Sequence, residues 1–212
     1  SMGIYIFNWK KLREYLIADE NDPNSDKDFG KNIIPNMLAA GEKLWPYRFS
    51  GYWRDVGTIT SLWDANMDML STTLINLYDP SWPIRSRSVA QPPHYVGPEA
   101  TVVHSIVTEG CEIDGHVENS VLSPSVKVQT GANVCYSVLM PGAVVECGAR
   151  VAYAILGENV RVGENARVGA SPEAAPPEEW GITVVGPEAQ VEAGRTLKAN
   201  RMLNREGKET VR

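Results

Sequence analysis

The fold of this 212-residue chain is decided by residues 122–168, which read LSPSVKVQTGANVCYSVLMPGAVVECGARVAYAILGENVRVGENARV. Aliphatic residues recur here at about six-residue intervals and, over longer distances, with a 17-residue spacing. Three sets share this longer spacing: Leu122, Leu139 and Leu156; Val128, Val145 and Val162; and Val134, Val151 and Val168. The shared spacing predicts a coil with three faces, in which each aliphatic residue stacks on its counterpart one coil away.

The six-residue pattern extends to both sides of this stretch. It is also present at residues 96–102, 107–113 and 185–191. Small residues such as Gly131 and Ala132 let the chain turn between short strands. Because a single coil cannot bury its aliphatic side chains, neighbouring coils must stack. The repeat therefore predicts a left-handed parallel β-helix over residues 96–212, with a loop or insertion at residues 170–180, which contain three prolines.

The residues before the repeat have the pattern of a fragment of an α/β domain. Residues 3–7 (GIYIF) predict a buried strand, and residues around Trp45, Tyr47 and Phe49 predict further strand-rich material. Three helices are expected, with Asn8, Asp28 and Thr58 as their N-caps. Because one opening strand and three helices leave apolar faces uncovered, we expect this domain to begin upstream.

Composition and charge exclude several classes of protein. The chain is 43% hydrophobic and 22% charged, as is usual for a soluble globular protein. No apolar run approaches the ~18 residues of a membrane span, and there is no basic-then-apolar leader. Residues 96–191 carry 4 Lys/Arg and 12 Asp/Glu, which argues against nucleic acid as a partner. The tail, residues 192–212, carries 6 Lys/Arg and 3 Asp/Glu, and is either a solvated terminus or an anion contact.

Three cysteines, Cys111, Cys135 and Cys147, lack CxxC spacing. We interpret them as buried free thiols in a reducing compartment, which favours the cytoplasm; a disulfide or metal role is the alternative.

The most informative short motif is GYWRDVGT at residues 51–58. Asp55 lies just before a Gly-Thr turn that opens a helix, where its carboxylate could bind Mg²⁺, a cation that prefers oxygen ligands. From the residues alone, a structural turn role for Asp55 explains the motif equally well.

Four segments together resemble the ADP-glucose pyrophosphorylase (glucose-1-phosphate adenylyltransferase) family of bacteria: residues 1–7 (SMGIYIF), 28–31 (DFGK), 51–58 and 78–85 (YDPSWPIR). The resemblance implies a Rossmann-like nucleotidyltransferase fold before the β-helix. It also implies an enzyme that converts ATP and glucose 1-phosphate to ADP-glucose and pyrophosphate, with Mg²⁺, for glycogen synthesis. We expect the end of the nucleotidyltransferase domain at residues 1–80, a linker at 81–95 and the β-helix domain with its basic tail at 96–212.

The resemblance also implies roles for particular residues. The glucose 1-phosphate pocket would include Ser1, Tyr5, Asp28, Phe29 and Trp53, and Asp55 would bind the metal ion. Aromatic faces can pack on a pyranose ring, and a carboxylate can accept hydrogen bonds from sugar hydroxyls. The alternatives are core packing for the aromatic residues and an N-cap for Asp28. Ser1 and Met2 can also be the remnant of a tag.

A glycine-rich phosphate-binding loop is absent from the sequence, which contains no GxGxxG. Because phosphoryl transfer needs several positioned groups at once, we expect the chain to be the C-terminal portion of such an enzyme and inactive alone.

The family resemblance implies tetramers, homomeric or heteromeric, with contacts through the β-helix. Arg85, Arg87 and Lys198 are candidate contacts for a phosphorylated allosteric effector, because charge lies there beside a domain boundary or in the basic tail.

Three alternative functions remain at this stage. One is a noncatalytic regulatory subunit of the same family, and another is a different sugar-1-phosphate nucleotidyltransferase. The third is a hexapeptide acyltransferase, for which His94, His104 and His116 are the candidate general bases.

Overall fold

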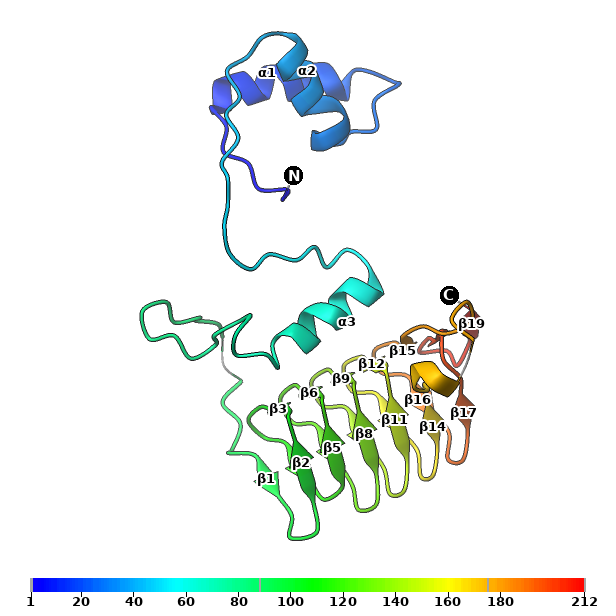
Figure 1. Cartoon of the computed structure of the whole chain (residues 1–212). Coiled ribbons are helices and arrows are strands. Elements are labelled where there is room, and N and C mark those ends of the chain that lie inside the picture. The colour runs from blue at the N-terminus through cyan, green and yellow to red at the C-terminus, as the bar shows by residue number, and fades with distance from the viewer. Residues whose placement is uncertain (1, 88, 175, 212) are drawn as a thin grey trace. The chain divides into compact units, whose positions relative to one another are not determined.

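The computed structural model describes residues 2–87, 89–174 and 176–211, and its compact units divide between Trp53 and Arg54 (Figure 1). Each unit is described by itself. The first is helical, and the second combines one helix with a parallel β-helix. The boundaries expected near residues 80 and 95 remain a prediction about domain organisation. Packing divides the chain earlier, because α3 (Ile59–Asp68) contacts the β-helix.

The first unit contains α1 (Trp9–Glu20), the π-helical turn η1 (Phe29–Ile33) and α2 (Ile34–Ala39). Its two predicted N-caps are confirmed. The Asn8 side chain accepts a hydrogen bond from the Lys10 amide at 3.0 Å, and the Asp28 side chain accepts one from the Lys31 amide at 2.8 Å. Each bond satisfies an amide that the helix itself leaves without a partner.

The strands expected in the first unit are wrong. Among the described residues, none before Tyr95 lies in a strand, and residues 3–7 and 45–49 have no regular structure. A strand needs a hydrogen-bonded neighbour, and the helices of this unit provide none. Ile4 and Ile6 are accordingly 74% and 99% exposed.

The third predicted helix is confirmed as α3. Thr58 and Ser61 form a reciprocal capping box at its start, in which each side-chain oxygen accepts from the other residue's amide at 3.1 Å. The apolar face of α3 packs against buried residues of the β-helix, Val138, Ile155 and Ile182.

Three parallel sheets form the faces of the β-helix, in agreement with the repeat (Figure 1). The first sheet contains β1 (Tyr95–Val96), β4 (Glu112–Ile113), β7 (Lys127–Val128), β10 (Val144–Val145), β13 (Arg161–Val162) and β16 (Gln190–Val191). The second contains β2 (Thr101–Val103), β5 (His116–Glu118), β8 (Asn133–Cys135), β11 (Arg150–Ala152), β14 (Arg167–Val168) and β17 (Thr196–Leu197). The third contains β3 (Ile106–Val107), β6 (Val121–Leu122), β9 (Val138–Leu139), β12 (Ala154–Leu156), β15 (Thr183–Val185), β18 (Arg201–Leu203) and β19 (Glu209–Val211).

The stacking predicted from the 17-residue spacing is confirmed in all three sheets. Leu139 pairs with Leu122 and Leu156, and the two sets of valines pair in the same way in the other sheets. All nine side chains are at most 1% exposed. Stacked aliphatic residues inside the three sheets therefore form one continuous apolar core.

Coil length departs from this regular spacing at two places. Ile113 pairs with Val128, which comes earlier in the chain than the repeat predicts, because the corner at Asp114 and Gly115 is shortened. A Cβ at Gly115 would lie 2.5 Å from the Ala132 carbonyl oxygen, so a side chain there would force the coils apart.

The second departure is the predicted insertion at residues 170–180, which is confirmed. Leu156 pairs with Val185, much later in the chain than one regular coil allows, and the short 3₁₀ helix η2 (Pro172–Ala174) lies in the added segment. At the C-terminal end of the third sheet, β19 pairs antiparallel with β18.

The expectation of three buried thiols is wrong for two of the cysteines. Cys111 is buried, and burial raises the pKa of its thiol above the ordinary value, whereas Cys135 is half-buried and Cys147 is exposed. All three are free thiols. No helix in the described part of the chain is both long and apolar enough for a membrane crossing.

Candidate functional site

Two of the predicted sugar-pocket residues, Tyr5 and Phe29, lie side by side in the first unit. Their ring centroids are 5.9 Å apart and their planes are inclined by 15°, which is a stacked arrangement. Phe7 joins them, with its ring 5.8 Å from Tyr5 and 5.9 Å from Phe29. Sequence reasoning missed Phe7, although its position two along from Tyr5 in an extended segment indicates a shared side.

Asp28 begins the helical turn that carries Phe29. Its Oδ1 accepts the Lys31 amide at 2.8 Å, and its own amide donates to Asn32 Oδ1 at 3.3 Å. The side chain is exposed, so its N-cap bond does not shut the carboxylate away from solvent. The structural role that the sequence allowed is therefore confirmed, and it is compatible with binding a hydroxyl group.

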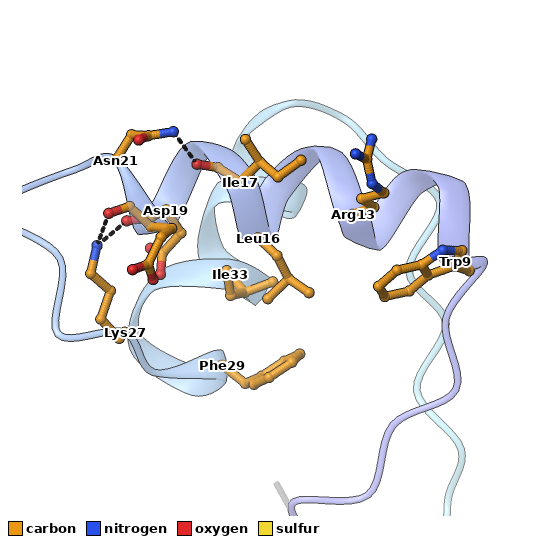
Figure 2. Close-up of a pocket in the computed structure, with 10 residues that line it drawn as sticks. Trp9, Arg13, Leu16, Ile17, Asp19, Asn21, Lys27, Phe29 and Ile33 are labelled. Carbon is orange, nitrogen blue, oxygen red and sulfur yellow. Dashed lines mark hydrogen bonds between the residues drawn. The ribbon is translucent and has the colours of Figure 1, made fainter.

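A cavity of about 580 Å³ lies between α1 and the segment that contains η1 (Figure 2). Figure 2 shows Phe29 and Ile33 facing α1 from η1, with Trp9 at one end and Lys27 at the other. The lining residues are Trp9, Arg13, Leu16, Ile17, Asp19, Glu20, Asn21, Lys27, Phe29 and Ile33. An apolar floor with charged groups along the rim can hold a ligand that has both apolar and hydroxyl-bearing faces.

The polar end of this cavity is a network of hydrogen bonds around Lys27 and Asp19. Lys27 Nζ donates to the carbonyl oxygens of Asp19, Glu20 and Asp22, the last two at 2.9 Å, at the C-terminal end of α1. Ser25 Oγ donates to the Asp19 carboxylate at 2.5 Å. A lysine is favourable there because the carbonyl groups of a helix C-terminus carry partial negative charge.

Sequence reasoning predicted Phe29 but missed the contribution of α1 to this cavity. Trp9, Arg13 and Leu16 follow one another at intervals of four and three, which places them on one face of the helix. That spacing was a usable signal, but it indicates a buried face as readily as a ligand site.

Asp55 occupies a local turn at the start of α3. Its Oδ1 accepts the Gly57 amide at 2.9 Å, and the carboxylate is exposed. A Cβ at Gly57 would lie 3.1 Å from that oxygen, so glycine gives the carboxylate room. The turn role that the sequence allowed is thus confirmed, and the exposed carboxylate retains access to a cation. Trp53, the last residue of the first unit, is 44% exposed.

Arg54 ties the segment before Asp55 to α3. Its guanidinium lies 3.0 Å from Asp64 and 2.7 Å from Asp68, two acidic side chains one helical turn apart. Trp63 anchors the same helix to the β-helix: its indole donates to the Tyr136 carbonyl at 2.8 Å, and its ring stacks on Tyr153 at 5.9 Å. The turn that presents Asp55 is therefore continuous with a helix fixed on the third sheet.

The remaining predicted residues lie in the second unit or outside the described residues. Arg85 and Arg87 are exposed in the connection between α3 and β1, and Lys198 is exposed after β17. In the basic tail, Arg195 and Arg201 lie 3.1 and 3.8 Å from Glu209, and Arg205 lies 2.7 Å from Glu188. Much of the tail's positive charge is thereby paired. Ser1 lies outside the described residues.

Two family models match this chain. A nucleotidyl transferase model matches residues 1–72, and a model described as GlmU-like, C-terminal hexapeptide, matches residues 93–186. A glucose-1-phosphate adenylyltransferase of Acetivibrio thermocellus is 46% identical over 210 residues, which cover 96% of this chain and 49% of that relative. The chain belongs to the glucose-1-phosphate adenylyltransferase family.

Other members of the family are similar over shorter stretches. Glucose-1-phosphate adenylyltransferases of Clostridium novyi and Fusobacterium nucleatum are 55% and 50% identical over 129 and 135 residues. These matches cover 60% and 63% of this chain, and 34% and 35% of the respective relatives. The chain thus spans about half the length of the Acetivibrio relative, and its matches span about a third of the other two.

Sequence similarity and packing assign α3 to different parts of the chain. By sequence it lies within the nucleotidyl transferase match, and by packing it belongs with the β-helix. The family gives no support to the acyltransferase alternative, and His94 and His104, two of its candidate bases, are exposed.

Proposed function

We propose that this chain is the C-terminal part of an enzyme that converts ATP and glucose 1-phosphate to ADP-glucose and pyrophosphate for glycogen synthesis. The observation that carries the proposal is the 46% identity to a glucose-1-phosphate adenylyltransferase over 96% of the chain. The proposed location is the cytoplasm, which suits a chain with three free thiols.

In this proposal the first unit supplies part of the glucose 1-phosphate pocket. The stacked rings of Tyr5 and Phe29 offer an apolar surface for the C–H face of the pyranose. Asp28 stands beside Phe29 with an exposed carboxylate that can accept hydrogen bonds from sugar hydroxyls. Ser1 and Trp53 are proposed for the same pocket.

Asp55 is proposed as a ligand of Mg²⁺. The donor set fits, because Mg²⁺ commonly binds one or two carboxylates and takes its other ligands from water and substrate phosphate. When bound, the ion would neutralise phosphate charge. The bond from the Gly57 amide fixes the direction of the carboxylate, and Arg54 pairs with Asp64 and Asp68 of α3.

The isolated chain is proposed to be inactive. Its sequence contains no GxGxxG and no other basic, glycine-rich run that could hold the ATP phosphates. Catalysis of phosphoryl transfer rests on charge neutralisation and positioning by several groups together. One carboxylate and a sugar-binding wall are too few for that chemistry.

The β-helix is proposed to serve regulation and oligomerisation, in a homo- or hetero-oligomer. Arg85, Arg87 and Lys198 are the proposed contacts for a phosphorylated effector, because three arginines of the tail are already paired with glutamates. Charge reversal at Arg85 that leaves the effector response of the full-length enzyme unaltered would count against this assignment.

The decisive experiment measures pyrophosphate release by the full-length parent protein with ATP, glucose 1-phosphate and Mg²⁺. Asp55→Asn is expected to lower kcat on the order of 10²-fold or more, because a charge at the transferring group is lost. Asp28→Asn is expected to raise KM for glucose 1-phosphate roughly 10-fold, the value of a charged hydrogen bond. Asp26→Asn is the matched control, since Asp26 is an exposed neighbour that pairs with Lys31.

The proposal fails if Asp55→Asn and Asp28→Asn both behave like the Asp26→Asn control. A parent protein without turnover, whose presence nevertheless changes the activity of a second subunit, would instead favour a noncatalytic regulatory subunit. If the parent protein is active only with a different sugar 1-phosphate, the proposed type of reaction stands and the proposed substrate is wrong.

A further inference from the structure

Three potential metal ligands of different chemistry meet on the outer face of the second sheet. His116 and Glu118 are the ends of β5, and Cys135 is the last residue of β8 in the next coil. Val117 between them is fully buried, so alternation along the strand turns His116 and Glu118 outward together. In the parallel register, Glu118 lies opposite Cys135 and His116 lies opposite Asn133.

The distances between these groups suit a shared cation. His116 Nε2 lies 3.5 Å from Glu118 Oε2, and the imidazole nitrogen, carboxylate oxygen and thiol sulfur all lie within 4.8 Å of one another. Tetrahedral zinc with ligand bonds of about 2.0–2.3 Å requires ligand atoms roughly 3.3–3.8 Å apart. A side-chain movement of about 1 Å therefore closes the site without a change in the backbone.

Neighbouring side chains form hydrogen bonds with two of these groups, Glu118 and Cys135. Asn119 Nδ2 donates to Glu118 Oε1 at 3.3 Å, which leaves Oε2 directed toward His116. His104 Nδ1 lies 2.7 Å from Asn119 Oδ1 and orients that amide, and Cys135 Sγ lies 2.9 Å from Asn133 Oδ1. Such outer hydrogen bonds are typical of metal sites, where they orient the ligands.

The backbone just before His116 is closely packed. His116 follows the shortened corner at Gly115, whose Cα is packed against the carbonyl groups of the next coil. The side chains of His116 and Glu118 are 34% and 42% exposed, so a cation can reach them from solvent. In the described part of the chain, no second group of three such donors lies this close together.

We propose that His116, Glu118 and Cys135 form a binding site for a divalent cation of the zinc class. A nitrogen, an oxygen and a sulfur donor favour Zn²⁺ over Mg²⁺ or Ca²⁺, which prefer oxygen alone. Three protein ligands leave one position for water. The bound ion joins two successive coils, and its role is independent of the Mg²⁺ proposed at Asp55.

The test is a titration of the untagged, chelator-treated 212-residue chain with Co²⁺ under reducing conditions, followed by displacement with Zn²⁺. The expected result is one equivalent of Co²⁺ with the absorption of a thiolate–cobalt bond, lost on addition of Zn²⁺. Cys135→Ser should abolish the thiolate band, and His116→Gln or Glu118→Gln should raise the Kd for Zn²⁺ at least 10-fold. Cys147→Ser is the control, because it removes an exposed thiol elsewhere and should leave binding unchanged.

Absence of a thiolate band in the unmodified chain would overturn the proposal, as would equal binding by Cys135→Ser. Loss of binding in Cys147→Ser with retention in Cys135→Ser would place the cation at a different thiol and would also overturn it. Circular dichroism of every variant checks whether the β-helix is intact. The near-isosteric Glu118→Gln change keeps the test valid if a variant at Cys135 does not fold.

Discussion

The first unit and the β-helix bury their apolar side chains to very different degrees. Leu122, Leu139 and Leu156 are fully buried in the β-helix, whereas Ile6 and Trp45 in the first unit are 99% and 87% exposed. Each coil of the β-helix covers its neighbours, so burial is provided by repetition along the chain. The described part of the first unit has only three short helical segments, and so small a set encloses little core. The β-helix is thus stabilised by its core, and the first unit largely by caps and polar links.

The difference in burial between the two units is tested most directly by making the same substitution, leucine to alanine, in each. Leu139→Ala removes a fully buried side chain and should lower the free energy of unfolding of the β-helix by about 2–5 kcal/mol. Leu38→Ala, at a side chain that is 57% exposed, should change stability by no more than about 0.5 kcal/mol. Urea denaturation followed by circular dichroism measures both. Equal losses would show that the two units are stabilised alike.

Trp63 tests whether α3 truly belongs with the β-helix. Trp63→Ala removes the stack on Tyr153 and the hydrogen bond to the Tyr136 carbonyl, and should destabilise the docked helix by about 2 kcal/mol. Hydrogen exchange of the α3 amides should then accelerate, while exchange in the core strands stays slow. Trp45→Ala, at an exposed tryptophan of the first unit, is the matched control. Unchanged protection of α3 in Trp63→Ala would mean that the helix is held by something else.

A smaller effect is expected at the cap of α3. Thr58→Ala removes one side of the capping box and should cost about 1 kcal/mol of local stability, visible as faster exchange in the first turn. Thr58→Ser keeps the hydroxyl and should restore protection. If Thr58→Ser does not restore the hydrogen-exchange protection seen with threonine, the methyl group rather than the hydrogen bond stabilises this turn.

The smallest expected effect is a pH dependence confined to the first unit. Lys11 lies 2.9 Å from Glu42 and holds the pKa of that carboxyl below its ordinary value of 4.5, with help from the Tyr15 hydroxyl. A lowered pKa in the folded state means that the link stabilises above pH 4.5 and is lost as pH falls through the lowered value.

NMR signals of the Tyr15 ring should therefore shift in acid, below about pH 4.5, and Glu42→Gln should remove that transition. The methyl signals of Leu139 should stay constant over the same range, because the described residues of the β-helix core include no carboxyl group. A transition that persists in Glu42→Gln would assign the pH dependence to another group.

The sequence predicted the β-helix almost completely, because its information is local and periodic. The spacing of Leu122, Leu139 and Leu156 alone predicted which residues pair across coils. It did not predict the shortened corner at Gly115, because the shorter spacing becomes evident only when the paired strands are known. Strands were wrongly expected at residues 3–7 because β-rich composition says nothing about whether a partner strand is present.

The candidate site was predicted in part. The structure brings together Tyr5 and Phe29, which the family resemblance had named, and adds Phe7 and the face of α1. Asp28 and Asp55 proved to be turn-forming residues with exposed carboxylates, so one side chain can combine a structural and a binding role. The cluster at His116, Glu118 and Cys135 escaped the sequence because its members join only when two coils stack in register.

The antiparallel strand β19 has a consequence for how long such a structure can grow. A parallel coil presents the same open edge at every step, and such an edge invites pairing with another chain, as monomers add to a fibre. By folding back on β18, β19 reverses the direction of the last strand of the third sheet. Parallel and antiparallel strands space their hydrogen bonds differently, so this edge no longer matches an incoming coil. At this edge, a further coil would not find the parallel pairing that joins the other coils of the sheet.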